Sequence, residues 1–132
     1  VVTPATASGI VDGAASCFIA SASYCSKHGL NPMAEIIDGY VIGVDPTCMG
    51  IGPAPAIKKL LEKNKLNLSQ IDLVEINEAF AAQTISCAKD LELSHEKLNI
   101  WGGAIALGHP LAASGVRIAT TLTRALKQQN KK

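Results

Sequence analysis

A histidine flanked by small residues is one candidate for chemistry in this sequence. His109 lies in the segment Gly108-His109-Pro110, where small neighbours allow a ligand or a backbone to approach closely. An imidazole titrates near neutral pH, so it is suited to general acid–base catalysis. Its local features alone favour a structural or solvated histidine in a tight turn, and that alternative stays open.

An asparagine at the end of an apolar run is the second candidate. Asn77 follows residues 71–76, which are predicted to form a strand, and ligands of open α/β sheets bind beyond the carboxyl ends of strands. Its amide could hold a water or polarise a carbonyl. The alternative is that Asn77 is the N-cap of the following helix, a position where asparagine is common.

Four residues of small or apolar type could line a ligand site. Met49 and Phe80 could form the wall of a narrow channel, although most such residues belong to a core. Ser8, next to Ala7, could bond an amide-containing ligand, although a serine in a turn is commoner. These residues become informative only in combination with other motifs.

Two other patterns are weaker. The glycine-rich segment 50–53 begins a predicted helix and resembles a phosphate cradle, but its proline removes a donor and G-x-G-x-x-G is absent. Asp72, Glu75 and Glu78 could pair as carboxylates. Their spacing more simply predicts a solvated strand edge and the first turn of a helix.

The composition is that of a globular domain without a strong electrostatic field. The chain has 132 residues and a net charge of +1, so neither nucleic acid nor an anionic membrane is an expected partner. No signal peptide or membrane-spanning run occurs, and four cysteines without metal spacing predict reduced, mostly buried thiols. We expect no metal or redox cofactor, and a cytoplasmic location, with the mitochondrion or peroxisome as alternatives.

Hydrophobic patterning predicts strands that alternate with helices. Apolar and β-branched runs predict three strands, and periodic runs predict four helices, joined by small-residue loops. This alternation is typical of an α/β fold with a largely parallel sheet. The predicted strands are 14–20, 34–44 and 71–76; the helices are 21–28, one that begins at Pro53, one from Phe80 to about Leu91, and 114–129; the loops are 48–53 and 99–110.

Four motifs in this order resemble the thiolase family. They are Ala7-Ser8-Gly9 with 12–15, the segment 49–53, Asn77-Glu78-Ala79-Phe80 with the residues that follow it, and GGAIALGHPLAASGVR over 102–117. The resemblance covers nearly the whole chain, and the last two motifs are highly specific. The sequence of residues 103–107 resembles the biosynthetic acetyl-CoA acetyltransferases more than the degradative 3-ketoacyl-CoA thiolases.

The resemblance implies a reversible Claisen condensation of two acetyl-CoA to acetoacetyl-CoA and free CoA. In the family, a histidine matching His109 draws the proton from a nucleophilic cysteine and then helps to stabilise the enolate oxygen. An asparagine matching Asn77 holds the water that completes this oxyanion hole. Ser8, with Ala7, matches the position that contacts the pantetheine of CoA, and Met49 and Phe80 match the apolar wall around the acyl group.

The resemblance also implies an incomplete α/β/α three-layer fold. The chain would supply strands 1, 2 and 3 of the C-terminal half, without the last two strands, and residues 1–13 would connect it to a preceding domain. Because both family cysteines lie in sequence motifs that this chain does not contain, the chain alone is expected to be inactive. Its first residues read as mid-chain, so we expect a segment of a longer protein.

The expected partners are acetyl-CoA, acetoacetyl-CoA and the rest of a thiolase chain, assembled as a homodimer or homotetramer. Two alternatives stay open: a non-catalytic fragment that binds CoA or a partner, from a truncated gene, and a degradative 3-ketoacyl-CoA thiolase. The missing sequence would separate the first alternative from an enzyme, because it either contains both cysteine motifs or lacks them.

Overall fold

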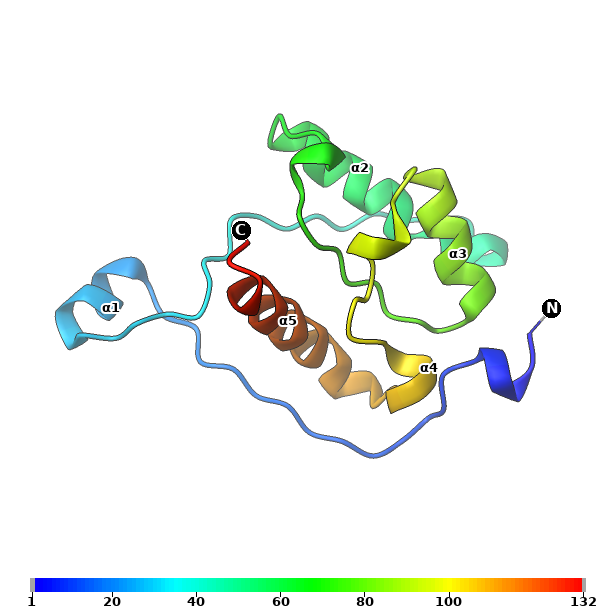
Figure 1. Cartoon of the computed structure of the whole chain (residues 1–132), viewed down its shortest axis with the longest axis horizontal. Coiled ribbons are helices and arrows are strands. Elements are labelled where there is room, and N and C mark those ends of the chain that lie inside the picture. Colours follow the sequence, from blue (N-terminus) through cyan, green and yellow to red (C-terminus); the bar gives the residue numbers. More distant parts are fainter. Residues whose placement is uncertain (1, 132) are drawn as a thin grey trace.

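Five α-helices and four short 3₁₀ helices account for the regular structure of this computed structural model, which describes residues 2–131. Helix α1 stands apart at one end, whereas α2, α3, α4 and α5 lie together (Figure 1). The α-helices are α1 (Ala22–His28), α2 (Pro53–Lys63), α3 (Ala81–Asp90), α4 (Ala104–Leu107) and α5 (Leu111–Gln128). The 3₁₀ helices are η1 (Pro4–Thr6), η2 (Pro46–Ile51), η3 (Leu68–Gln70) and η4 (His95–Lys97).

The predicted helices are confirmed, with small differences at their ends. Helix α1 begins after Ser21, whose hydroxyl accepts from the Tyr24 N–H, and it ends at Gly29 in the left-handed conformation (φ 63°). Prolines open α2 because the first helical N–H groups have no intrahelical partner. Helix α5 begins at Leu111, three residues earlier than predicted. The predicted loop 99–110 contains α4, and η2 overlaps the predicted loop 48–53.

The three predicted strands do not form as regular strands within residues 2–131. The segments 14–20 and 34–44 are extended but make no β-bridge, and in 71–76 only Val74 makes a bridge, a parallel one with Leu98. A strand is stable only when its backbone N–H and C=O groups are paired. These runs have the composition of buried strands, so pairing partners, rather than β propensity, are what they lack here.

The core lies between α2, α3 and the irregular segments 71–76 and 93–98. Small and aliphatic residues fill it, and Cys87 is fully buried at its centre, with its thiol donating to the Gly50 carbonyl (3.4 Å). The core residues are Ala54, Val74, Ile76, Cys87, Ala88, Leu91, Leu93 and Leu98.

The cysteine prediction is confirmed in one part and wrong in another. All four cysteines are free thiols, as expected. Only Cys87 is buried, whereas Cys17 and Cys48 are exposed and Cys25 is half-buried. Cys17 is exposed because it lies on an extended segment outside the packed helices.

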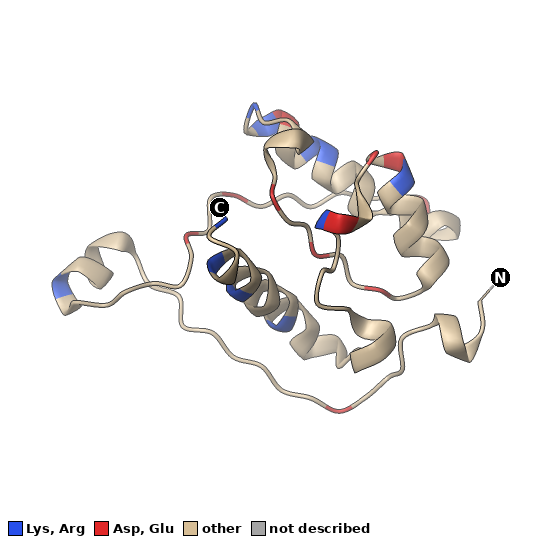
Figure 2. Cartoon of the chain, viewed as in Figure 1, with Lys and Arg blue, Asp and Glu red and all other residues tan. Residues whose placement is uncertain are grey.

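The extended segments present large apolar side chains to solvent. Charged side chains gather on α2, around the end of α3 and on α5, whereas Asp12 and Lys27 alone carry charge between residues 2 and 34 (Figure 2). An exposed apolar surface of this extent marks an interface rather than a solvated face. The largest exposures are Val41 95%, Ile10 85%, Phe18 77%, Ile36 75%, Ile37 74% and Ile19 72%.

We therefore expect the isolated 132-residue chain to show no sharp thermal unfolding transition. Unpaired extended segments and exposed apolar side chains leave too little buried surface to offset the entropy of ordering the chain. Circular dichroism of the isolated chain during heating would measure this, with the full-length protein that contains these residues as the control. A single steep, reversible transition of the isolated chain would contradict the expectation.

No helix within residues 2–131 is both long and apolar enough to cross a membrane. In the same range, no group of three or more His, Cys, Asp or Glu side chains is arranged to hold a metal ion.

Candidate functional site

The loop that contains Asn77 lies against the segment near the N-terminus. The backbone N–H of Ser8 donates to the Ala79 carbonyl (3.1 Å), and the Ser8 hydroxyl donates to the same oxygen (3.4 Å). Ala7 and Phe80 form an isolated antiparallel bridge. Three of the predicted binding residues, Ala7, Ser8 and Phe80, are thus brought together next to Asn77.

The same segment continues to His109. The backbone N–H of His109 donates to the Gly9 carbonyl (2.8 Å), one residue beyond Ser8. Gly108, just before the histidine, has a left-handed φ of 89°, and a Cβ built on it would lie 2.5 Å from Val11 Cγ2. Only glycine fits at position 108, because the Val11 side chain lies against it, and the Gly9 carbonyl bonds the next residue, His109.

A second connection runs on the other side of the two loops. The Glu78 carboxylate accepts from the Ile105 N–H (3.1 Å), and Ile105 belongs to the short helix α4. That helix ends at Leu107, two residues before His109. The contacts therefore form a closed ring: from Glu78 to α4, to His109, to the Gly9–Ser8 segment, to Ala79 and back to Glu78.

Ser114 is the hydrogen-bond partner of the histidine ring. His109 Nδ1 lies 2.6 Å from the Ser114 hydroxyl, and that hydroxyl is 3.2 Å from the Pro110 carbonyl, which can only accept. When the single hydroxyl proton is donated to Pro110, the oxygen accepts from Nδ1–H and Nε2 carries the free lone pair. This tautomer, assigned from the bonding pattern, makes Nε2 available as a base. Ser114 is 4% exposed, so the pair is protected from competing water.

Asn77 does not cap a helix, so the N-cap alternative is wrong. Helix α3 begins at Ala81 with Phe80 at the N-cap position, three residues further on. Asn77 Oδ1 is buried and has no hydrogen-bond partner among the described residues. A buried amide oxygen without a partner costs free energy, and such groups in native proteins often belong to functional sites.

The sequence predicted that the acidic residues of this region are solvated. The structure shows that some of them are not. Glu78 does not lie in the first turn of α3, and its two oxygens are bonded within the protein. Glu75 Oε2 is buried without a hydrogen-bond partner in residues 2–131. Burial raises the pKa of Glu75, the nearby Arg117 guanidinium lowers it, and the Glu78 carboxylate raises it again.

Met49 lies on a different element from the other candidates. It is 62% exposed on η2, and a Cβ on the next residue, Gly50, would lie 2.9 Å from Gln83 Cγ in α3. The η2 segment is thereby packed on the helix that Phe80 begins. Met49 is therefore placed near the start of α3, and residues 2–131 leave its side chain exposed.

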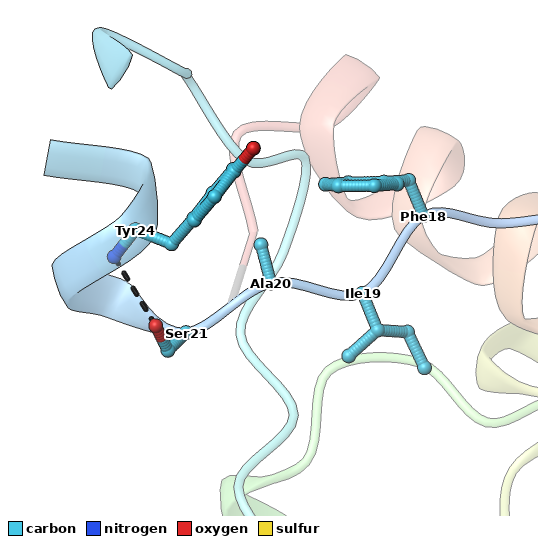
Figure 3. A pocket seen from close by; sticks show the side chains of 5 residues that line it. All are labelled: Phe18, Ile19, Ala20, Ser21 and Tyr24. Atoms are coloured by element: carbon cyan, nitrogen blue, oxygen red, sulfur yellow. Dashed lines mark hydrogen bonds between the residues drawn. The ribbon is translucent and has the colours of Figure 1, made fainter. Parts of the chain in front are cut away.

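Two hollows of the surface have neither His109 nor Asn77 in their lining. One is lined by Phe18, Ile19, Ala20, Ser21 and Tyr24, where the rings of Phe18 and Tyr24 lie on the same side, 6.3 Å apart (Figure 3). The other lies between η2 and α3 and includes Gln83. The first is framed by an extended segment with exposed apolar side chains, so its shape depends on what covers that segment.

Two residues with a structural part in this site were missed in the sequence. Ser114 lies inside a predicted helix, where serine carries no signal of its own. Asn99 has a left-handed φ of 47°, which asparagine tolerates better than most residues, and it lay in a predicted loop. Asn99 lies 21 residues after Glu78, so no local sequence pattern indicates that the two side chains form a hydrogen bond.

Comparison with known proteins gives a consistent set of relatives. A family profile described as the thiolase C-terminal domain matches residues 30–132. The bovine mitochondrial 3-ketoacyl-CoA thiolase is 50% identical over 131 residues, 99% of this chain and 33% of that protein. The mouse cytosolic acetyl-CoA acetyltransferase is 50% identical over 127 residues, 96% of this chain and 32% of that protein.

A solved structure is similar over almost the whole chain. The acetyl-CoA acetyltransferase of Bacillus anthracis superposes with a TM-score of 0.97 at 46% identity, covering 99% of this chain and 33% of that one. This similarity confirms the predicted fold class, a partial α/β domain of the thiolase type. The chain spans about a third of the length of the relatives that it matches.

Proposed function

The chain belongs to the thiolase family, and on that premise we propose that it forms part of an acyltransferase that condenses two acetyl-CoA into acetoacetyl-CoA. The observation that carries the proposal is the closed ring of contacts joining the Asn77 loop to His109. The ring supports a common site for a base and an amide, which the condensation requires. The family's two cysteines would be supplied by the rest of the full-length protein.

Each step has a group suited to it. His109 Nε2, with its lone pair free, accepts the proton of the nucleophilic cysteine thiol, and the thiolate attacks the acetyl thioester and releases CoA. The released CoA thiolate takes the proton of the other cysteine, whose thiolate then removes an α-proton from the second acetyl-CoA. The enolate attacks the acyl-enzyme carbonyl, and the nucleophilic cysteine leaves as its thiolate. The protonated His109 and the water held by Asn77 stabilise the enolate oxygen.

The substrate contacts follow the positions of the remaining candidates. Ser8 and Ala7 bind the pantetheine part of CoA, and the wall around the acyl group is formed by Phe80, three residues after Asn77, and by Met49 on η2. Substrates are CoA thioesters, and no metal or redox cofactor takes part. The proposed assembly is a homodimer or homotetramer in the cytoplasm, with mitochondria and peroxisomes as alternatives.

A degradative 3-ketoacyl-CoA thiolase is the second candidate. It is favoured by a specific observation, since a mitochondrial 3-ketoacyl-CoA thiolase and a cytosolic acetyltransferase are equally similar to this chain, each at 50% identity. The chemistry is the same in both, and only the length of the acyl group differs. A non-catalytic fragment is the third candidate. It requires that the full-length protein contain neither of the two cysteine motifs.

Thiolysis by the full-length protein distinguishes these candidates. We expect cleavage of acetoacetyl-CoA with a kcat/KM at least about tenfold higher than that for longer 3-ketoacyl-CoAs, because extra methylenes do not fit a site built for acetyl groups. Loss of the absorbance of the 3-ketoacyl thioester measures the rate. A preference for longer substrates would establish the degradative activity, and no cleavage of any of them would overturn the enzymatic proposal.

A further inference from the structure

Glu78 connects two loops that the proposed chemistry needs in one place. One carboxylate oxygen accepts from Asn99 Nδ2 (3.1 Å) and the other accepts from the Ile105 N–H (3.1 Å). Both partners are donors, and each carboxylate oxygen accepts from one of them. Glu78 follows Asn77 directly, and Ile105 lies four residues before His109.

Asn99 extends this connection to the residue before Asn77. Its Oδ1 accepts from the Ile76 N–H (2.8 Å) and its Nδ2 donates to the Ile76 carbonyl (2.8 Å), while its own N–H donates to the Val74 carbonyl (3.0 Å). Asn99 is 8% exposed. One side chain therefore holds both backbone polar groups of Ile76 and the Glu78 carboxylate in a buried network.

Gly103 gives independent evidence that the Glu78 carboxylate lies close to the backbone of the opposite loop. A Cβ on Gly103 would lie 2.3 Å from Glu78 Cδ and 2.6 Å from each carboxylate oxygen. The φ of Gly103 is −146°, a value that any residue adopts, so the backbone does not require glycine here. The carboxylate requires it, because the backbone of 103 forms the wall against which Glu78 packs.

We propose that Glu78 is a positioning residue, whose carboxylate fixes the Asn77 loop relative to the loop that leads to His109. This inference rests on the proposed function for its kinetic consequence, but its structural content stands on the contacts alone. The Ser8–Gly9 segment holds the two loops together on one side, and Glu78 holds them on the other. Without Glu78 the ring is open, and Asn77 and His109 can separate.

Glu78→Gln in the full-length protein is the direct test. Glutamine has one accepting oxygen, so its NH₂ group must face a donor, either Asn99 Nδ2 or the Ile105 N–H, and one contact is lost. We expect kcat for acetoacetyl-CoA thiolysis to fall about tenfold while KM stays within about twofold, since Glu78 does not touch substrate. Glu35→Gln, at an exposed position, is the matched control and should be unchanged.

A double-mutant cycle separates positioning from general destabilisation. If Glu78 acts by placing Asn77 relative to His109, then Glu78→Gln should lower kcat by less than about twofold in an Asn77→Ala background. A tenfold loss in both backgrounds would show that Glu78 affects the protein generally and would overturn the inference.

A second variant addresses the case in which Glu78→Gln fails to fold. Gly103→Ala places a methyl group against the carboxylate and should reproduce the kcat loss. Gly115→Ala is its control, because a Cβ at Gly115 meets nothing within 4 Å. Full kcat in Gly103→Ala would contradict the close packing on which the inference depends.

Hydrogen exchange measured by mass spectrometry tests the inference without any activity. Peptides covering 74–80 and 99–108 should exchange faster in Glu78→Gln than in the wild type, while peptides from α2 should not change. A wild-type protein without thiolysis would sink the proposed function and leave this result interpretable. Unchanged exchange in both loops would sink the positioning role, whatever the activity.

Discussion

Replacing His109 with asparagine in the full-length protein is expected to lower the rate of acetoacetyl-CoA thiolysis by about 10²–10⁴-fold, the usual contribution of a general base. The reason is that, in the tautomer whose Nδ1–H donates to the Ser114 hydroxyl, Nε2 is free to take the proton of the cysteine thiol. Asparagine has no basic atom at that position. Steady-state thiolysis at saturating substrate measures the loss.

The pH dependence of the residual rate gives this prediction a sharper form. Without the base, the thiolate forms only by ionisation of the cysteine itself, whose ordinary pKa is about 8.5. The residual rate of His109→Asn should therefore rise with pH up to about that value. His95→Asn, in the exposed η4 helix, is the matched control and should keep the wild-type rate and profile. A His109→Asn rate within about threefold of the wild type would exclude His109 as the base.

The helices could be predicted from the sequence because their signals are local. Ser21 and Gly29 limit α1, prolines open α2, and the apolar periodicity of α5 lies within the helix itself. The sequence could not show that the predicted strands would be unpaired. The runs at 14–20 and 34–44 have strand composition, but a strand needs a partner that is far away in sequence, and residues 2–131 provide none for them.

The candidate site could be predicted in part for the same reason. His109, Asn77 and Ser8 stand in recognisable motifs, so their types and order were visible. Glu78 stands in the same motif, but its bonding partners lie 21 and 27 residues further along the chain. An acidic residue before a helix has a simple local explanation, and that explanation concealed a buried network.

The role of Met49 in an apolar wall stays a prediction. Its position in a glycine-rich motif suggested the wall of a narrow channel, yet it is 62% exposed. A single residue type cannot indicate whether other segments cover it. The exposed apolar runs of this chain have the same cause, since burial is a property of the whole assembly and not of the segment.

Replacing Asn77 with alanine is expected to lower thiolysis by about 10²–10³-fold, as the loss of one oxyanion-hole donor does. The structure also leads to an expectation for the thermal stability of this variant. Asn77 Oδ1 is buried and has no hydrogen-bond partner in residues 2–131, and Asn77 caps no helix. Removing a buried oxygen that makes no bond should cost little stability, so the melting temperature should change by only about 2–4 °C or less.

The combination of a large kinetic effect and a small thermal one is what identifies a functional amide. A structural asparagine would give the reverse, since loss of a cap or a buried bond lowers stability first. Thermal melts and thiolysis rates of the same full-length preparation measure both, with Asn31→Ala at an exposed position as the control. An Asn77→Ala protein that melts far below the wild type while its kcat at low temperature is intact would assign Asn77 to the fold and remove it from the chemistry.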